Sequence, residues 1–304
     1  MQTLASDLDY IDLTFLGVPQ IIATVVLRTA GGVALIDPGP SSCLDTLRRS
    51  LGERGASFHD VQALLLTHIH LDHAGATGML VRENPAIQVF VHQRGAPHVI
   101  DPARLLESAR RLYGANMDRL WGAVLPVPSA NVHALSGGER IPIGDHDLDV
   151  AYTPGHASHH VSYFDGRSRI AFVGDTAGVR IGRGRYVLAP TPPPDIDLES
   201  WSTSVAKIES WPPDTLFLTH FGPFQPAGHL QDLLEHLRES AEMVRHTLET
   251  GENDAESMAK YVERMRLELR RHLSEEEVGQ YERACPLDQA WLGLARYWRK
   301  RRSG

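Results

Sequence analysis

The stretch LLLTHIHLDHAGA, residues Leu64–Ala76, places three histidines and one aspartate within six positions, directly after an apolar run. These four residues are His68, His70, Asp72 and His73. Imidazoles at this density repel one another when protonated, so a partner must keep them neutral, and a metal ion is the usual partner. The stretch therefore predicts a metal site on a loop after a buried strand, and the rest of the chain must complete it.

The composition indicates a globular chain. Its 304 residues are 42% hydrophobic, which suffices for one large core with an appendage. The formal net charge of −8 argues against a general nucleic-acid binder, because such proteins carry basic surfaces. Cys43 and Cys285 lie far apart and outside any CxxC pattern, so neither a disulfide framework nor a thiolate metal site is indicated.

The sequence carries no recognisable targeting signal. The N-terminal stretch MQTLASDLDYIDLTF lacks a basic start followed by an apolar segment, so we expect no signal peptide. No apolar run approaches the roughly 20 residues that a membrane-spanning helix needs. We therefore expect a cytoplasmic protein with neither membrane nor nucleic-acid partners.

Up to about Phe224, short apolar runs alternate with Gly and Pro, which is typical of strands separated by turns. The runs expected to form strands are Gln20–Thr29, Gly32–Gly39, Val61–His68, Ala86–His92, Leu148–His156, Arg169–Thr176 and Asp214–Gly222. Several of them end in a turn that carries His or Asp. Catalytic and binding residues of sheet proteins commonly lie on such loops, because the sheet holds the ends of the loops rigidly.

Helical periodicity appears between the strands and after them. Helices are expected over Ser41–Leu51, Asp101–Trp121 and Pro194–Trp211. In the second of these, Asp101 is the expected cap and Pro102 the first helical residue, and this insert could cover a site. From about Ala227 the pattern becomes amphipathic and helical, and Ser274 with Glu277 forms a capping box for a third helix there.

Four more candidates lie at the ends of expected strands: Asp37 in LIDPG, His156 in YTPGHASHH, Asp175 in FVGDT and His220 in LTHFGP. The order HxHxDH, then His, Asp and His resembles the metallo-β-lactamase superfamily of metallohydrolases. The resemblance covers roughly Ile11–Phe224.

The resemblance implies an α/β (α+β) fold of the αββα type, with two mixed sheets face to face and helices outside. The metals would lie at one edge of that sandwich, where the strand-end loops meet. We expect a catalytic domain over 1–225, with a helical insert at about 96–122, and a C-terminal helical region over 226–304. We expect one or both helical additions to restrict access, by covering the site or by forming a homodimer contact beside it; the alternative is that both only support the sandwich from outside.

The resemblance also implies a ligand set for two metal ions. His68, His70 and His156 would bind the first ion, and Asp72, His73 and His220 the second. Asp175 would bridge both, Asp72 would also act in catalysis, and Asp37 would orient ligand groups from behind. Imidazole and carboxylate ligands suit two divalent ions, for which we expect zinc, with iron or manganese as alternatives.

The implied reaction is hydrolysis of a small ester, thioester or lactone by a metal-bridging hydroxide, because metals lower the pKa of bound water to about 7. A phosphodiesterase, a mononuclear-iron sulfur dioxygenase and a non-catalytic metal-binding protein remain alternatives. Metallo-β-lactamases proper generally lack the bridging aspartate, so Asp175 argues against antibiotic hydrolysis. The partner is expected to be a small-molecule substrate.

The roles of several residues near the motifs stay open. Arg180, Arg183, Arg185 and Tyr186 follow Asp175, and they could bind an anionic substrate group or form a solvated basic loop. Tyr113 and Tyr186 are alternatives for a catalytic tyrosine of the lactonase type, and His159 and His160 are candidates for lining the site. The C-terminal run RYWRKRR favours a solvated helix end or tail.

Overall fold

Two mixed sheets lie at the centre of the computed structural model, which describes residues 1–182, 184, 186–249 and 253–302. The first sheet has the order β1 (Gln2–Ala5), β2 (Leu8–Asp12), β3 (Ala23–Thr29), β4 (Gly32–Ile36), β5 (Val61–Leu65), β6 (Gln88–His92) and β7 (Val132–Leu135). The second has the order β13 (Gly222–Phe224), β12 (Thr215–Leu218), β11 (Ile170–Phe172), β10 (Val161–Asp165), β9 (His146–Tyr152) and β8 (Arg140–Ile143). In the first sheet β4 to β7 run parallel, and in the second only β11 and β12 do.

Central strands such as β3 and β4 are largely buried on both faces, and their side chains alternate between two cores. In β3, Val25 and Leu27 belong to the cluster between the sheets, whereas Val26 belongs to the cluster under the outer helices. The same outer cluster includes Leu47 of α1 (Leu44–Gly52) and Leu80 of α3 (Thr77–Glu83). Because helices cover both outer faces, the strands are near-continuous apolar runs.

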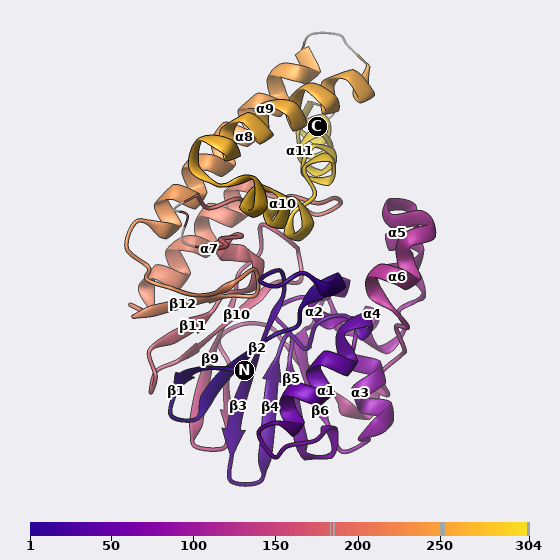
Figure 1. Ribbon diagram of the computed structural model, residues 1–304, viewed down its shortest axis with the longest axis vertical. Coiled ribbons are helices and arrows are strands. Elements are labelled where there is room, and N and C mark those ends of the chain that lie inside the picture. Colours follow the sequence, from indigo (N-terminus) through magenta and orange to yellow (C-terminus); the bar gives the residue numbers. More distant parts are fainter. Residues whose placement is uncertain (183, 185, 250–252, 303–304) are drawn as a thin grey trace.

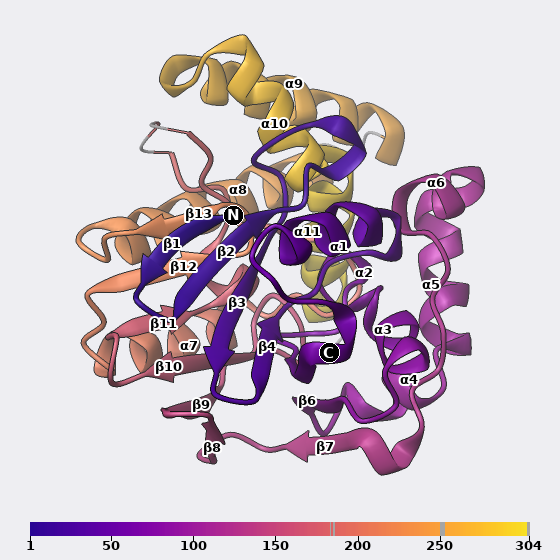
Figure 2. The same ribbon diagram turned by 60° about the horizontal axis from the view of Figure 1, so that its bottom comes forward.

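The helices form the outer layers of an αββα sandwich, as expected (Figures 1 and 2). On the first sheet, α1 and α3 join α4 (Ala96–Ile100) on one side, and α7 (Leu198–Ser210) packs against the second sheet. The four-residue helix α2 (Leu71–Ala74) lies at the edge where the sheets meet. Short 3₁₀ turns complete this part of the chain: η1 (Phe15–Gly17), η2 (Ser41–Cys43), η3 (Phe58–Asp60), η4 (Gly114–Asn116), η5 (Ser129–Asn131) and η6 (Gly174–Ala177).

The insert differs from the single helix expected over Asp101–Trp121. It contains α5 (Ala103–Tyr113) and α6 (Met117–Trp121), separated by a turn that begins at Gly114 with φ of 51°. A left-handed residue ends a helix, and glycine adopts that conformation without a steric penalty. The N-cap of α5 is Pro102 and not Asp101, one position later than expected, although the Asp101 carboxylate accepts a hydrogen bond from the Ala103 N–H at 3.1 Å.

Within its described residues, the C-terminal region consists of four helices: α8 (His229–Glu249), α9 (Asp254–His272), α10 (Glu275–Ala284) and α11 (Leu287–Arg302). The capping box at Ser274 and Glu277 is present at the start of α10, as predicted. The sequence pattern did not predict α11, whose last turn holds most of the basic run. That run is therefore a helix end over its described part, which reaches Arg302.

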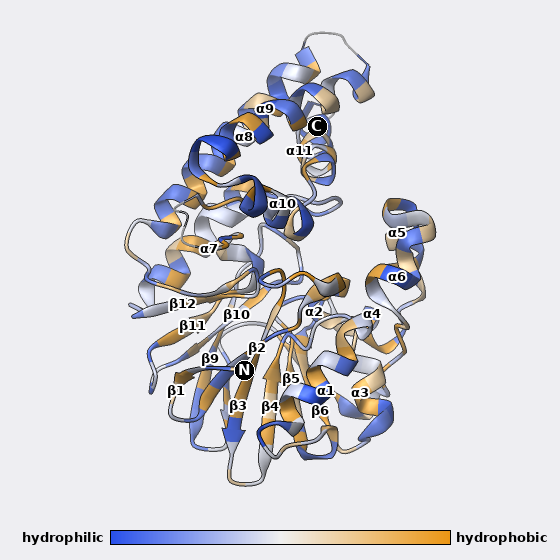
Figure 3. Ribbon diagram, in the orientation of Figure 1, coloured by the Kyte–Doolittle hydropathy of each residue, from blue (hydrophilic) through white to orange (hydrophobic). Residues whose placement is uncertain are grey.

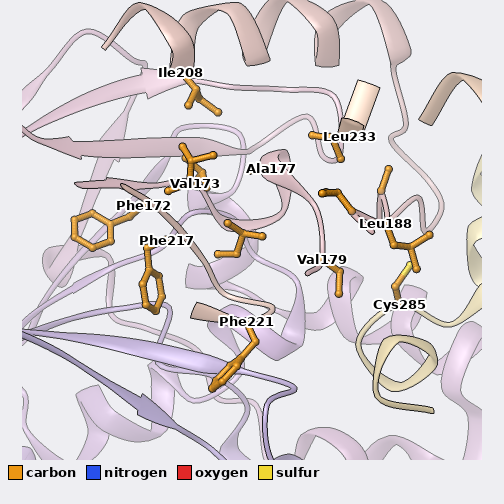
Figure 4. Packing of buried hydrophobic residues seen from close by; sticks show 14 of the residues in the cluster. Phe172, Val173, Ala177, Val179, Leu188, Ile208, Phe217, Phe221, Leu233 and Cys285 are labelled. Carbon is orange, nitrogen blue, oxygen red and sulfur yellow. The ribbon is translucent and has the colours of Figure 1, made fainter. Parts of the chain in front are cut away.

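The C-terminal helices share the core of the sandwich. Leu233 of α8 and Cys285 after α10 belong to the same buried cluster as Phe172 and Phe217 of the second sheet (Figure 4). The outer faces of these helices are hydrophilic, whereas the central strands are hydrophobic (Figure 3). Among the helices of the described residues, none combines the length and the apolar character needed to cross a bilayer.

Candidate metal centre and substrate cavity

The histidine motif occupies the turn between β5 and α2. Strand β5 ends at Leu65, His68 and His70 lie on the following loop, and α2 begins at Leu71. One helical turn then carries Asp72 and His73 beside that loop. Thus a short helix directly after a buried strand gathers all four side chains of the motif.

The second sheet contributes three more side chains, each after a strand. His156 follows β9, His220 follows β12, and Asp175 lies in η6 after β11. Gly174 has φ of 46°, and a Cβ there would lie 2.6 Å from the Thr67 Oγ1 atom. Glycine at this position therefore permits the close approach that brings Asp175 to the loop of the first sheet.

The seven side chains form three overlapping groups, in which the ligand atoms lie within 4.8 Å of one another. These groups are His68, His70 and His156; Asp72, His73 and His220; and His68, His73 and Asp175. The first two coincide with the two ligand sets that the sequence predicts. In the first group, the His70 Nδ1 atom lies 3.0 Å from both the His68 Nε2 and the His156 Nε2 atoms.

Asp175 lies between the first two groups and faces each with a different oxygen. Its Oδ2 atom lies 3.3 Å from the His156 Nε2 atom. Its Oδ1 atom lies 3.2 Å from the His73 Nε2 atom and 3.6 Å from the His220 Nε2 atom. This is the arrangement that a carboxylate bridging two cations requires.

The ring orientations are fixed from outside the cluster. Four Nδ1 atoms lie within hydrogen-bond distance of outer acceptors: His68 of Thr67 Oγ1, His73 of Asp37 Oδ2, His156 of the Pro190 carbonyl and His220 of the Ile21 carbonyl. A proton on Nδ1 leaves the Nε2 lone pair pointing inward, which is the form that binds a metal. His70 is the exception, since its Nδ1 atom faces the cluster.

Asp37 connects the motif loop to the second sheet. Its carboxylate accepts hydrogen bonds from the Thr67 N–H at 2.8 Å, the Thr67 hydroxyl at 2.7 Å and the Thr219 hydroxyl at 2.9 Å. The same carboxylate lies 2.8 Å from the His73 Nδ1 atom. These contacts agree with the orienting role that the sequence predicts for Asp37.

The electrostatics of the cluster favour bound cations. Burial, reinforced by neighbouring imidazoles, lowers the pKa of His68 and lowers that of His70 to about 4. Burial raises the pKa of Asp72, but His73 and His220 outweigh it and hold that pKa at about 2. Burial lowers the pKa of His73 and of His220, but Asp175 and Asp72 outweigh it and raise both. Imidazoles bind metals in the neutral form, so an ion in this group would replace the protons on these two histidines.

The cluster also contains buried polar atoms that nothing in the described chain satisfies. The Nε2 atoms of His73 and His220 and the Oδ1 atom of Asp175 have no hydrogen-bond partner. Orphaned buried polar atoms are rare in folded proteins and call for an explanation such as an ion. Since all three point into the same cluster, the residues present fit a metal centre.

The family model of the metallo-β-lactamase superfamily matches residues 17–220, a range that includes all seven side chains. The chain belongs to the metallo-β-lactamase superfamily. It is accordingly a metal-dependent hydrolase, which agrees with the resemblance seen in its motifs. The chain is 26% identical over 251 residues to the metallo-β-lactamase fold-containing protein ST1585 of Sulfurisphaera tokodaii, covering 81% of this chain and 89% of that protein.

Two further proteins are similar to this chain over different shares of its length. The hydroxyacylglutathione hydrolase of Buchnera aphidicola is 29% identical over 152 residues, and the match covers 50% of this chain and 45% of that enzyme. The crystal structure of the metallo-β-lactamase family protein TTHA1429 of Thermus thermophilus superposes with a TM-score of 0.69 at 22% identity. That match covers 98% of this chain and 95% of the other, so the two folds agree into the C-terminal helices.

A cavity of about 350 Å³ opens onto the metal centre of this superfamily member. His70, Asp72, His156 and Asp175 form part of its wall. Further parts of the wall come from α4 and α5 of the insert, from the Pro190–Asp195 loop, and from residues around the junction of α10 and α11. Both helical additions therefore border the site, which is one of the two arrangements expected from the sequence.

The two additions also contact each other across the cavity. The Tyr113 hydroxyl at the end of α5 donates a hydrogen bond to the Gln289 Oε1 atom of α11 at 3.3 Å. Tyr113 lines the cavity, as does His159, whereas His160 lies behind the cluster and contacts Thr153 and Thr176. Of the two candidate tyrosines and the two candidate histidines, one of each thus lines the cavity.

Among the described residues of the basic segment after Asp175, neither Arg180 nor Tyr186 lines this cavity, so the anion-binding interpretation has no support there. Arg180 donates a hydrogen bond to the Gly184 carbonyl and lies over the Phe224 ring. Tyr186 is buried against His236, with ring centroids 4.1 Å apart. This segment is held by the C-terminal helices, and Arg183 and Arg185 lie outside the described residues.

The sequence pattern missed three other cavity residues, Arg94, His98 and Arg104. They lie before α4, within it and early in α5, so they approach the site only through the packing of the insert. An isolated Arg or His on a loop or helix carries no signal in a single sequence.

Proposed function

We propose that this hydrolase uses two divalent metal ions to cleave a small ester, thioester or lactone. The observation that carries the proposal is the position of Asp175, whose two carboxylate oxygens face different histidine groups. Two ions in such a site supply Lewis acidity and a water of lowered pKa, so that a nucleophile is present at neutral pH.

In this proposal each ligand residue is assigned to one of the two ions or to both. His68, His70 and His156 would hold one ion, Asp72, His73 and His220 would hold the other, and Asp175 would contact both. Asp72 also lines the cavity and retains 21% of its side-chain exposure. Its carboxylate can therefore accept a hydrogen bond from the attacking water and orient it toward the substrate.

The shape of the cavity favours a small substrate. Its volume of about 350 Å³ lies near the lower end of the range for small-molecule sites. Helix α5 and the segment between α10 and α11 border the cavity beside the metal centre, which favours a small substrate over a polymer. The hydroxyacylglutathione hydrolases among the relatives are thioesterases by name, which supports a thioester as one substrate class.

Zinc is the metal that we propose. The ligand set consists of imidazoles and carboxylates without thiolates, which also accommodates iron and manganese. Reconstitution of the metal-depleted protein with each ion in turn compares the three directly.

The test is a metal-defined activity screen. The protein reconstituted with zinc, iron or manganese is assayed on p-nitrophenyl esters, thioesters, lactones and phosphodiesters, and its metal content is measured in parallel. We expect close to two ions per chain and activity on one of the first three classes. A single iron per chain without hydrolysis, or a preference for phosphodiesters, would overturn the proposal.

A further inference from the structure

One wall of the cavity is cationic, and the metal centre does not account for it. Arg94 precedes α4, His98 lies within α4, and Arg104 lies in the first turn of α5. All three line the cavity that contains His70 and Asp72. The insert thus places two guanidinium groups in the wall of the same cavity as the metal centre.

The two guanidinium groups are available for a ligand. Both side chains are exposed, and within the described part of the chain no carboxylate lies at ion-pair distance from either. Arg94 does lie over the Tyr152 ring, with 5.8 Å between its guanidinium carbon and the ring centroid. By contrast, Arg48 is paired with Glu83 through two hydrogen bonds of 2.7 Å.

The carboxylates in the cavity are already engaged. Asp72 and Asp175 belong to the metal centre, and the Asp195 Oδ2 atom accepts a hydrogen bond from the Ser158 hydroxyl at 2.5 Å. An anion entering the cavity would therefore meet unpaired positive charge at Arg94 and Arg104. Guanidinium groups bind carboxylate and phosphate oxygens through paired N–H donors.

A buried polar atom between the metal centre and the cationic wall provides independent support. His159 is 9% exposed and lines the cavity, yet its Nδ1 atom has no hydrogen-bond partner among the described residues. Its ring lies 5.7 Å from that of His70, and His98 is near enough to influence its charge. A ligand that spans the cavity would supply a partner for this imidazole.

We infer that the cavity selects substrates with an anionic group at the end remote from the scissile bond, and that Arg94 and Arg104 bind this group. The inference rests on the proposed function and specifies its substrate class. A carboxylate and a phosphate ester share the required oxyanion chemistry, so both enter the test. The reacting carbonyl would lie at the metal centre, with His159 beside the segment that joins the two ends.

The kinetic test compares two esters of equal chain length with the metal-loaded enzyme. The first is mono(4-nitrophenyl) glutarate, which ends in a carboxylate, and the second is 4-nitrophenyl pentanoate, which ends in a methyl group. We expect kcat/KM to be at least about tenfold higher for the glutarate ester, because hydrogen bonds to charged groups contribute that much or more. Arg94→Gln and Arg104→Gln should each lower the ratio of the two constants about tenfold.

Arg110→Gln is the matched control, since Arg110 is exposed on the same helix, α5, and is not among the cavity-lining residues. This variant should keep the wild-type ratio. A wild-type ratio near one, or an equal loss in the Arg110 variant, would overturn the inference.

An equilibrium measurement separates this inference from the proposed function. Titration calorimetry with monomethyl glutarate, methyl phosphate and the neutral dimethyl glutarate reports binding without turnover. Binding of either anion that weakens about tenfold in both Arg94→Gln and Arg104→Gln supports the inference even if no ester is hydrolysed. Equal binding of the neutral diester, or anion binding unchanged in both variants, would overturn it even if esters are hydrolysed.

Discussion

At the scale of single residues, the candidate site depends on which atoms remain unsatisfied in its interior. Outer hydrogen bonds satisfy the Nδ1 atoms of His73 and His220, whereas their Nε2 atoms and one oxygen of Asp175 have none. Such a pattern costs free energy unless a ligand fills the centre. The folded chain therefore holds these side chains in positions suited to metal ions before any ion is bound.

The bridging position of Asp175 leads to the first prediction. Asp175→Ala removes the only side chain whose oxygens face both proposed metal groups in the described structure. We expect the metal content to fall from about two ions per chain to one or fewer, and hydrolysis to fall at least about 100-fold. Elemental analysis after dialysis measures the first effect, with Asp145→Ala in an exposed turn as the control. Retention of both ions at wild-type affinity would refute the bridging assignment.

The second prediction concerns Asp37, which touches no proposed metal position. Asp37→Asn keeps the volume but places an amide where donors from Thr67, Thr219 and His73 now converge. At least one buried donor would lose its acceptor, so the free energy of unfolding should fall by about 1–3 kcal/mol. Metal affinity should fall about 10–100-fold, because His73 loses its orienting partner. Chemical denaturation and metal competition measure both effects, and equality with the exposed control Asp147→Asn would contradict the prediction.

At the scale of elements, the sequence predicted several strands, including the short β11 and β12, and missed others of similar length. The run over Val61–His68 became β5 and the motif loop, because a buried parallel strand is a continuous apolar run. Strand β10 was missed, since it directly follows the polar stretch that contains His156 and ends in a buried Asp165. Strand β13 has three residues and contains a proline, so its pattern is too short to detect.

The sequence anticipated the metal centre better than the cavity around it. The motif HxHxDH and its partners follow strands, so their meeting at one sheet edge follows from the topology. The cationic wall depends on how α4 and α5 pack, and neither Arg94 nor Arg104 stands in a recognisable pattern. Of the two interpretations left open for the segment after Asp175, the anion-binding one finds no support at Arg180 or Tyr186, since the C-terminal helices contact that region.

The third prediction tests whether α5 limits the size of the substrate. Tyr113→Ala removes a ring that lines the cavity and contacts Gln289 of α11. The ratio of kcat/KM for 4-nitrophenyl dodecanoate to that for 4-nitrophenyl butyrate should rise about tenfold, which is the discrimination that a few methylene contacts provide. Arg110→Ala on the outer part of α5 should leave the ratio unchanged. An unchanged ratio in the Tyr113 variant would mean that α5 only supports the sandwich.

At the scale of the whole molecule, the C-terminal helices and the sandwich form one packed unit. The Tyr281 hydroxyl of α10 accepts a hydrogen bond from the Ile181 N–H and donates one to the Tyr186 carbonyl. Helix α11 contacts the loop after Pro190, where the Thr191 hydroxyl donates to the Ala290 carbonyl at 3.2 Å. Because Pro190 in turn holds His156, the position of α11 is linked to a proposed metal ligand.

The last prediction tests this link through Gly293 of α11. A Cβ atom there would lie 2.0 Å from the Thr191 carbonyl oxygen and 2.9 Å from the Pro192 carbonyl carbon, so the helix and the loop must separate. Gly293→Val should lower the free energy of unfolding by about 1–3 kcal/mol, as overpacking typically does. It should also weaken metal binding, since a displaced Pro190 carbonyl no longer orients the His156 ring.

Gly279→Ala in α10 is the matched control, because the nearest heavy atom to its Cβ would be the Arg283 Nη1 atom at an ordinary 3.5 Å. Alanine also favours a helix more than glycine does, so this variant should be as stable as the wild type or more so. Thermal unfolding with and without added zinc, together with metal titration, measures both variants. If Gly293→Val loses stability but keeps wild-type metal affinity, α11 supports the fold without influencing the site. Wild-type values for both quantities would mean that the loop and the helix are not in close contact.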